Sequence, residues 1–381
     1  MTTLLVASTG GHLAELYDLV PRLGIGDRRW VTFDSEQSRS LLAGEDIVYV
    51  PPAGSRDVVG TVRDLIAARR MFRRDRYERV ISTGASIAVS FFLPALAAGI
   101  ESTYIESATR TEGPSLTGRL AARVPGVRRF TQYPSWAGDG WQYGGSIFDG
   151  FEAVPRPGPI RIGKVVVTLG MHPRYTFPRL LERLVRILPP DMEVLWQVGA
   201  TRINRMPPGA RDQMPVAELR AAMREADVVI SHAGVGSALA AMRAGRRAVY
   251  VPRRRAHGEH VDDHQVALAA GLDRRNLVLA READRIDLAD LETAAAWSIH
   301  TSPDVAPFPT WRETDRSVCA SSPHQAADPS AFAGDGDLAE RRSSGCRGRA
   351  AARRDGDRFG QPGGLHAAGA ERQRSRLHPD R

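Results

Sequence analysis

Segments that suit β-strands alternate with segments that suit α-helices along the first 300 residues of this 381-residue chain. Such alternation is typical of parallel sheets covered by helices on both faces. In the first half we expect strands at Leu4–Ser8, Trp30–Phe33, Ile47–Val50, Val80–Thr83 and Thr103–Glu106. Before the fourth of these, the spacing of Val58, Val62, Leu65 and Ile66 predicts one face of an amphipathic helix.

The segment Phe151–Ile160 contains three prolines, so we interpret it as a linker, after which the alternation restarts. Further strands are expected at Val165–Val167, Val194–Gln197, Val228–Ile230 and Ala248–Val251. A chain of this length exceeds the size at which one hydrophobic core usually stops growing. The sequence therefore predicts an α/β protein with two doubly wound, Rossmann-like domains facing across a cleft, at residues 1–152 and 163–300 with a linker at 153–162.

The composition changes at about residue 301. In residues 301–381, Leu, Ile, Val and Phe together number only 8 of 81, far below the roughly 20% at which burial can offset chain entropy. We expect this tail to be disordered and without function, and its abrupt start resembles a coding sequence read in the wrong frame. A regulatory tail is the alternative.

The charge and cysteine content exclude several classes of protein. Lys164 is the only lysine among 52 basic residues, a bias that does not indicate nucleic-acid binding, although the net charge of +8 suits phosphate-bearing partners or an anionic membrane. Both cysteines, Cys319 and Cys346, lie in the tail, which excludes a disulfide framework in the two predicted domains.

The sequence predicts a cytoplasmic protein. No signal peptide precedes the first strand, and the longest apolar stretch, Ile87–Ile100, is too short to span a bilayer. The basic helix end Arg69–Arg76 leaves open a peripheral contact at the inner face of the membrane, with a solvated helix end as the simpler interpretation.

A first candidate site is Ser8-Thr9-Gly10-Gly11-His12, where the first strand should turn into the first helix. Glycines at such a turn let a ligand approach the backbone, and the first helical turn favours negative charge. His12 would stand at the carboxyl end of the sheet, where it could act as a general base. A tight turn with a surface histidine is the alternative.

A second candidate is Ser231-His232-Ala233-Gly234-Val235-Gly236-Ser237, which follows an expected strand and precedes a helix. This arrangement can hold a diphosphate on backbone amides, with the Ser237 hydroxyl as an added donor. The motif lacks the third glycine of a dinucleotide fingerprint and the Gly-Lys-Ser/Thr ending of a Walker loop, so a nicotinamide cofactor and an ATPase are both disfavoured. A purely structural turn remains open.

A third candidate is the loop Pro252–Gln265, which carries Arg253, three histidines and several carboxylates. Its arginines could neutralise a diphosphate, and its other polar side chains could bind sugar hydroxyls. The histidines also allow a metal-binding interpretation, but no spacing matches a helical zinc pair, so we expect no metal. A solvated loop is the simplest alternative.

Together these motifs resemble glycosyltransferase family 28, the family of MurG-like enzymes. The similarity of the donor-binding half lies in Ser231–Ser237, Gly245, Pro252 and His264-Gln265. The N-terminal motifs Thr9–Leu13, Ser82–Ala85 and Tyr104–Ser107 look like the acceptor-side, membrane-associated half. In PssD and PssE type exopolysaccharide transferases, and in the two-subunit dolichol-linked N-acetylglucosaminyltransferase, these halves are separate chains, and here they look fused.

The resemblance implies a GT-B fold and inverting, metal-independent transfer of a hexosyl group. The expected donor is an NDP-sugar, with UDP as the nucleotide, and the expected acceptor is a lipid-linked or polysaccharide-precursor glycan of the cell envelope. No cofactor is implied, because the sugar nucleotide is a substrate. Members often bind the ribose through a glutamate where this chain has Ala240, so that contact is expected from Glu259 or Asp262.

The resemblance also assigns residue roles, with acceptor activation given to His12. Diphosphate contacts fall to Gly234, Val235, Gly236, Ser237 and Arg253. Donor sugar or nucleotide contacts fall to Gly170, Gln197, His232, Glu259, His264 and Gln265. The acceptor side comprises Gly10, Gly11, Thr83, Gly84 and Glu106.

Two other functions stay open. The first is an NDP-sugar 2-epimerase or hydrolase on the same fold, which would convert the donor without an acceptor. The second is a catalytically inactive protein that only binds a nucleotide sugar.

Overall fold

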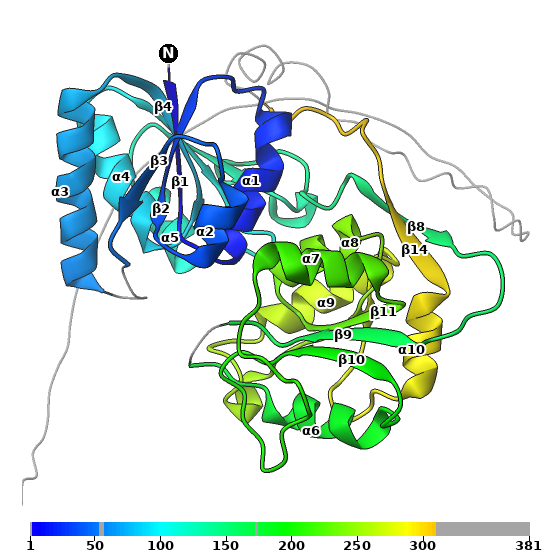
Figure 1. Ribbon diagram of the computed structural model, residues 1–381. Coiled ribbons are helices and arrows are strands. Elements are labelled where there is room, and N and C mark those ends of the chain that lie inside the picture. Colours follow the sequence, from blue (N-terminus) through cyan, green and yellow to red (C-terminus); the bar gives the residue numbers. More distant parts are fainter. Residues whose placement is uncertain (1, 53–56, 172–173, 310–381) are drawn as a thin grey trace, which may run out of the picture. The chain divides into compact units, whose positions relative to one another are not determined.

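The computed structural model describes residues 2–52, 57–171 and 174–309. All of these fall within one compact unit, Met1–Ser321. They form two parallel sheets, each flanked by helices, and one short antiparallel pair (Figure 1). We call the part built on the first sheet the N-terminal lobe and the part built on the second the C-terminal lobe.

The N-terminal lobe has a seven-stranded parallel sheet in the order β3-β2-β1-β4-β5-β6-β7. Its strands are β1 (Thr2–Ala7), β2 (Arg28–Phe33), β3 (Ile47–Val50), β4 (Tyr77–Gly84), β5 (Glu101–Ile105), β6 (Val127–Thr131) and β7 (Trp141–Tyr143). Its helices are α1 (Gly11–Leu23), α2 (Glu36–Leu41), α3 (Val58–Arg74), α4 (Ser86–Ala97) and α5 (Leu116–Ala121), with a 3-10 turn, η1, at Pro134–Trp136. The first five strands confirm the sequence prediction.

The C-terminal lobe has a five-stranded parallel sheet in the order β10-β9-β11-β12-β13. Its strands are β9 (Lys164–Thr168), β10 (Glu193–Gln197), β11 (Val228–His232), β12 (Val249–Val251) and β13 (Leu279–Ala280). Its helices are α6 (Pro178–Ile187), α7 (Val216–Glu225), α8 (Val235–Arg243), α9 (His264–Arg274) and α10 (Leu288–Ala295), with a 3-10 turn, η2, at Arg255–His257. The predicted α/β class with two Rossmann-like sheets is confirmed.

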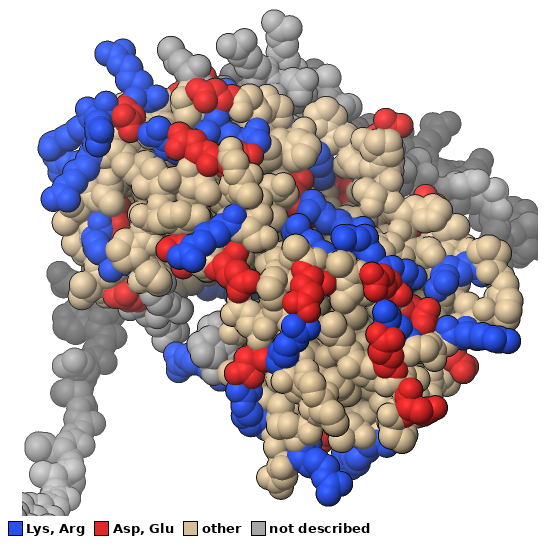
Figure 2. Space-filling model, viewed as in Figure 1, with Lys and Arg blue, Asp and Glu red and all other residues tan. Residues whose placement is uncertain are grey.

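The amphipathic helix α3 forms as expected, but most of its apolar stripe does not face the core. Val58, Val62 and Ile66 are exposed, whereas Gly60, Asp64 and Ala68 are buried. Small residues on the buried face allow α3 to pack closely on α4. Figure 2 shows basic side chains gathered at the C-terminal end of α3, where its last turn carries Arg73 and Arg74.

The interpretation of Phe151–Ile160 as a linker is wrong for its first half. β8 (Phe151–Pro155) pairs in antiparallel fashion with β14 (Trp297–Thr301), with Ala153 opposite Ile299. Pro155 is tolerated because it is the last residue of a strand in a two-stranded sheet and no further ladder hydrogen bond is needed there.

The predicted disorder of the tail is also wrong for its first residues. After β14 the chain reaches the N-terminal lobe, where Phe308 is fully buried with its ring centroid 5.2 Å from that of Phe130. The Phe308 amide donates a hydrogen bond to the Arg22 carbonyl at 2.7 Å. Residues 310–381, on which the rest of that prediction falls, lie outside the described residues.

The two lobes share a hydrophobic cluster through α1 and α8. Leu13 and Leu16 of α1 belong to the same buried cluster as Val235 and Leu239 of α8. Asp18 of α1 also forms an ion pair with Arg243 of α8. Within the described chain, no helix combines the length and the apolar character needed to cross a bilayer.

Candidate active site

His12 lies in the first turn of α1, directly beyond the carboxyl end of β1. Its Nδ1 is 2.9 Å from the carbonyl oxygen of Thr83, on the neighbouring strand β4. Because a carbonyl can only accept, Nδ1 carries the proton and donates it. The Thr83 hydroxyl in turn donates to the His12 carbonyl at 2.8 Å. The lone pair is therefore on Nε2, the atom that a general base would use.

The surroundings keep this imidazole neutral. Burial lowers the pKa of His12 to about 4, the Thr83 hydrogen bond opposes that shift, and the positive charge of Arg110 adds to it. Gly84 makes room for the ring, because a Cβ there would lie 3.0 Å from His12 Cε1, and its φ of +127° is one that other residues rarely adopt. Thr83 and Gly84 thus orient His12.

Gly10 and Gly11, the two glycines before His12, have different backbone contacts. Gly10 is held by the Gln37 side chain, which accepts from the Gly10 amide at 2.6 Å and donates to the Gly10 carbonyl at 3.0 Å. Gly11 opens α1, and a Cβ there would meet nothing within 4 Å. The Gly10 amide is therefore already engaged, although a Cβ at Gly10 would also meet nothing within 4 Å.

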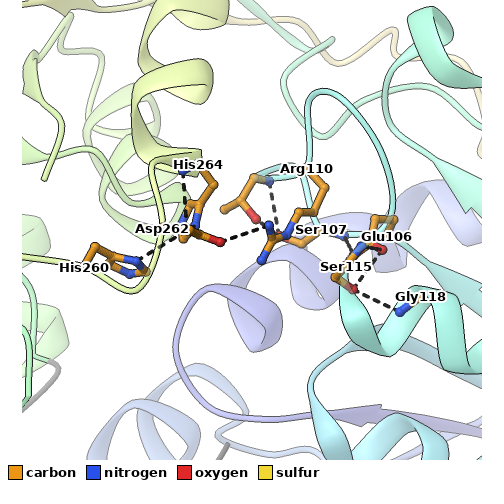
Figure 3. Close-up of polar contacts among 9 residues, drawn as sticks. Glu106, Ser107, Arg110, Ser115, Gly118, His260, Asp262 and His264 are labelled. Carbon is orange, nitrogen blue, oxygen red and sulfur yellow. Dashed lines mark hydrogen bonds and ion pairs between the residues drawn. The ribbon is translucent and has the colours of Figure 1, made fainter. Parts of the chain in front are cut away.

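Glu106, predicted on the acceptor side, is buried just after β5. One carboxyl oxygen accepts from the Tyr104 hydroxyl and the Ser107 amide, each at 3.0 Å. The other accepts from the Ser115 amide at 2.8 Å and the Ser115 hydroxyl at 3.0 Å (Figure 3). Both oxygens are thereby occupied, so we revise the role of Glu106 from acceptor contact to anchor of the loop between β5 and α5.

Glu15 is a second buried carboxyl at this loop, and the sequence does not reveal it. It accepts from the Ser107 hydroxyl at 2.7 Å and from the Ala108 amide at 3.1 Å. Burial raises the pKa of Glu15 to about 8. Glu15 lies on α1, three residues after His12, so it links the loop to the helix that carries the candidate base.

The candidate diphosphate site lies at the start of α8. The Gly234 amide donates to the His232 carbonyl at 2.8 Å and is therefore not available to a ligand. The amides of Val235, Gly236 and Ser237 form the first helical turn, where amides have no acceptor within the helix. A Cβ at Gly236 would meet nothing within 4 Å, so space is open there. The candidate anion-binding groups are therefore the amides of Val235, Gly236 and Ser237.

His232 stands beside this helix start. A Cβ at Gly170 would lie 2.7 Å from its ring, and one at Gly234 would lie 2.5 Å from it, so both glycines are needed for the ring to fit. Its Nδ1 is 3.3 Å from the Ser237 hydroxyl oxygen. Burial, followed by the charge of Arg253, lowers the pKa of His232 to about 3. A neutral imidazole therefore orients the Ser237 hydroxyl.

Arg253 and Gln265 hold the loop after β12 in place. The Arg253 guanidinium is buried, donates to the Leu169 carbonyl and lies 5.7 Å from the Phe177 ring centroid. Burial lowers the pKa of Arg253 to about 10. Its amide donates to the Gln265 side chain at 3.0 Å. These contacts lie within the C-terminal lobe, but the Arg253 Nε is buried without a hydrogen-bond partner among the described residues, so its role as a diphosphate ligand stays a prediction.

Two further predicted donor contacts are also occupied within their own lobe. The buried Glu259 carboxylate accepts two hydrogen bonds of 3.1 Å from Arg179 and one of 2.9 Å from the Arg254 amide. The Gln197 side chain donates to the Thr168 hydroxyl and accepts from the Met214 amide. Ribose recognition by Glu259 is therefore disfavoured, because its carboxylate is already satisfied.

Asp262, His264 and Arg110 form a polar contact between the lobes (Figure 3). His264, the first residue of α9, is hydrogen-bonded through Nδ1 to the Asp262 carboxylate. The Arg110 guanidinium, from the loop after β5, lies 3.2 Å from the same carboxylate. Sequence patterns do not single out Arg110, and its only signal is its place shortly after an expected strand.

These residues mark one junction. His12 and Arg110 follow β1 and β5, whose carboxyl ends share an edge of the first sheet. His264 follows β12, a parallel neighbour of β11, so the starts of α8 and α9 share an edge of the second sheet. The Arg110–Asp262 ion pair joins the two edges. The carboxyl ends of parallel strands are the place where open α/β folds bind ligands.

The same cluster contains the residues that could hold a metal. Donor atoms of His260, Asp262 and His264 lie within 4.8 Å of one another, and two imidazoles with one carboxylate suit a first-row transition metal. Arg110 opposes such a site, because its positive charge already compensates Asp262.

A pocket of about 480 Å³ lies elsewhere in the C-terminal lobe, between Arg179, Arg254 and Arg285. Acidic side chains of Glu282 and Asp284 also line it. Its lining includes no residue of the α8 start and neither His12 nor His264, so its volume does not bear on the candidate site.

Comparison with known proteins shows what the chain is similar to. Residues 177–288 match the glycosyltransferase family 28 C-terminal domain, whereas comparison with curated protein sequences gives no match. The glycosyltransferase SnogD from Streptomyces nogalater superimposes with a TM-score of 0.50 at 19% identity, over 77% of this chain and 92% of that one. MurG from Acinetobacter baumannii gives 0.49 at 18% identity, over 77% and 89%.

The two parallel sheets and the fold shared with SnogD show the GT-B fold of glycosyltransferases. Within the C-terminal lobe, residues 177–288 match the C-terminal domain of glycosyltransferase family 28. The match includes Ser231–Ser237, so the family expected from that motif is confirmed.

Proposed function

We propose that this chain transfers a hexosyl group from a UDP-sugar, with inversion and without a metal, to a lipid-linked or polysaccharide-precursor acceptor. The observation that carries the proposal is the junction itself, where a neutral imidazole on one lobe and free helix amides on the other lie at the meeting edges. An acceptor hydroxyl and a donor diphosphate need these two kinds of group.

In the proposed reaction His12 Nε2 takes the proton of the acceptor hydroxyl as its oxygen attacks the anomeric carbon. The bond between that carbon and the diphosphate oxygen breaks, and the electron pair leaves with the nucleoside diphosphate. The amides of Val235, Gly236 and Ser237, together with the positive end of the α8 dipole, stabilise the departing charge. Attack from the side opposite the leaving group inverts the anomeric centre.

Binding and turnover test the proposal separately. We expect UDP to bind more tightly than GDP or dTDP in calorimetric titrations. Ser237→Ala should weaken that binding by about 3–10-fold, the loss of one hydrogen bond. His12→Ala should leave binding unchanged and reduce acceptor-dependent release of UDP by about 100-fold or more. Conversion of the UDP-sugar without any acceptor would instead identify an epimerase or hydrolase, and binding without turnover an inactive binding protein.

The exposed face formed by α3 and α4 supports peripheral attachment to an anionic membrane. Its exposed apolar side chains are Val58, Val59, Val62, Ile66, Leu93 and Leu96. The basic residues Arg73 and Arg74 follow at the end of α3. Apolar insertion combined with arginines, each contributing on the order of 1 kcal/mol near anionic lipid, is the pattern of an interfacial helix.

Vesicle co-sedimentation tests this attachment. We expect the protein to bind vesicles that contain anionic lipid, and binding to fall strongly in the double variant Val59→Asp with Val62→Asp. Leu288→Asp, which changes an exposed leucine on α10, is the matched control and should bind as the wild type does. Equal binding by the wild type and the double variant would exclude this face.

A further inference from the structure

A nucleoside diphosphate leaves the reaction with negative charge that helix amides alone only partly offset. Of the arginines expected to neutralise it, Arg253 is buried against the Leu169 carbonyl and Arg254 is paired with Glu282. Both contacts lie within the C-terminal lobe, although the Arg253 Nε has no hydrogen-bond partner among the described residues and Arg255 is exposed. Arg110 is an arginine that reaches the same junction from the N-terminal lobe.

Arg110 has a fixed backbone at this place. Its carbonyl accepts a hydrogen bond of 3.0 Å from the Trp136 indole, and its amide donates to the Ser107 carbonyl at 2.9 Å. The Ser107 amide is itself bound to the buried carboxyl of Glu106 (Figure 3). The Ser107 hydroxyl is bound to the buried carboxyl of Glu15. A buried network thus sets where the Arg110 side chain begins.

The side chain of Arg110 extends to the other lobe, where its guanidinium meets Asp262. Its positive charge also acts on both His12 and His264. Arg110 therefore lies close to the candidate base and to the start of α9. Since α8 and α9 begin at the same edge of the second sheet, Arg110 lies on the side of the junction where the diphosphate would bind.

The contact between Arg110 and Asp262 is well suited to exchange. The two side chains are 32% and 37% exposed, and ion pairs at such exposure contribute little to stability. A diphosphate offers the guanidinium more charge and a bidentate geometry that matches its fork. Asp262 would keep its hydrogen bond to His264 after such an exchange.

We propose that Arg110 is a diphosphate ligand supplied by the N-terminal lobe, and that Asp262 holds its guanidinium until a nucleotide binds. This inference rests on the proposed function, because it assigns a second ligand to the same donor. It gives a metal-independent transferase a cation from the N-terminal lobe that stabilises its leaving group.

Calorimetric titration of three ligands tests the proposal, using UDP, UMP and uridine with wild type, Arg110→Ala and Arg110→Lys. We expect Arg110→Ala to weaken UDP binding by about 10-fold or more, as for the loss of a charge-assisted contact, and to leave uridine binding unchanged. Arg110→Lys should recover part of the loss, since it keeps the charge without the fork. Arg119→Ala is the matched control on α5, exposed and in the same lobe, and should bind UDP as the wild type does.

Asp262→Asn separates a ligand from a structural ion pair. If Asp262 competes with the diphosphate for Arg110, this variant should bind UDP at least as tightly as the wild type. An equal loss of UDP binding in Asp262→Asn and Arg110→Ala would overturn the proposal. It would show that UDP binding depends on the intact ion pair between Arg110 and Asp262, and not on Arg110 as a ligand.

Failure of this inference is distinguishable from failure of the proposed function. A wild-type protein that binds none of the three ligands would overturn both. A wild-type protein that binds UDP with an affinity unchanged in Arg110→Ala would overturn only the role of Arg110. Loss of UDP binding on treatment with EDTA would also overturn the proposal, because the cation would then be a metal held by His260, Asp262 and His264.

Discussion

At the scale of single residues, the hydrogen bond between His12 and the Thr83 carbonyl decides what His12 can do. It fixes the tautomer, so that the nitrogen facing away from β4 is always the one with the lone pair. A histidine that drifted between tautomers would be a competent base for only part of the time. The neighbouring Gly84 belongs to the same arrangement, since a side chain there would push the ring away.

The pH dependence of the reaction follows from this residue. A base must be unprotonated, so the rate falls as the pH drops through its pKa. Because burial lowers the pKa of His12 to about 4, we expect kcat/KM of the wild type to stay level through neutral pH and to decline only as the pH approaches about 4. A pH–rate profile with its acidic limb near the ordinary histidine value of about 6.5 would contradict this expectation.

At the scale of elements, a substitution at the start of α8 should affect the stability of the protein and its binding of UDP in opposite directions. The amides of its first turn attract negative charge whether that charge belongs to a ligand or to a side chain. Gly236 is the position at which to test this, since a Cβ there meets nothing, whereas one at Gly234 would strike His232.

We expect Gly236→Asp to leave the protein as stable as the wild type or more stable by about 0.3–1 kcal/mol, because a carboxylate suits the helix start. The same carboxylate should repel the diphosphate and weaken UDP binding by at least about 10-fold. Gly236→Asn, similar in shape and neutral, is the control and should keep most of the affinity. Thermal unfolding and UDP titration of both variants measure the two effects, and retained affinity in Gly236→Asp would remove α8 from the site.

The elements also show what a sequence pattern can and cannot predict. Strands buried on both faces, such as β1 and β9, are continuous apolar runs and were predictable. β6 was not, because Arg128 and Arg129 interrupt its apolar residues and lie half-buried in the folded lobe. β8 was not predicted because Pro155 and the prolines that follow it indicate a linker. Only its pairing with β14, far along the chain, makes it a strand.

Only part of the candidate site could be predicted from the sequence. Glycine-rich turns after strands are local patterns, so the α8 start and His12 could be found from the sequence. Which side chains are already satisfied is a matter of tertiary contacts, so the occupied carboxyls of Glu106 and Glu259 could not be foreseen. Arg110 depends on a partner 152 residues away in the chain, a separation that no periodicity reports.

At the scale of the whole molecule, residues after β14 belong to the N-terminal lobe through Phe308. Its side chain is fully buried against Phe130, and a Cβ added at Gly144 would strike its ring. Phe308 therefore joins a hydrophobic cluster that also contains residues from the beginning of the chain, such as Leu5, and residues of the C-terminal lobe, such as Leu239.

We expect Phe308→Ala to destabilise the protein by about 3–5 kcal/mol, the usual effect of removing a buried phenyl ring. Leu120→Ala, at an exposed position of α5, should change the stability by no more than about 0.5 kcal/mol. Urea unfolding of the two variants makes the comparison. A Phe308→Ala protein as stable as the wild type would mean that the ring contributes nothing to the N-terminal lobe.

The pairing of β8 with β14 has a consequence for anyone who would express the halves of this protein as separate polypeptides. Dividing the chain anywhere between residues 156 and 163 leaves β8 on one fragment and β14 on the other. Each piece would then carry a row of unsatisfied backbone groups, a template for pairing with the wrong molecule. Dividing the chain cleanly would require moving β14 together with Phe308 onto the first fragment, as a circular permutation does.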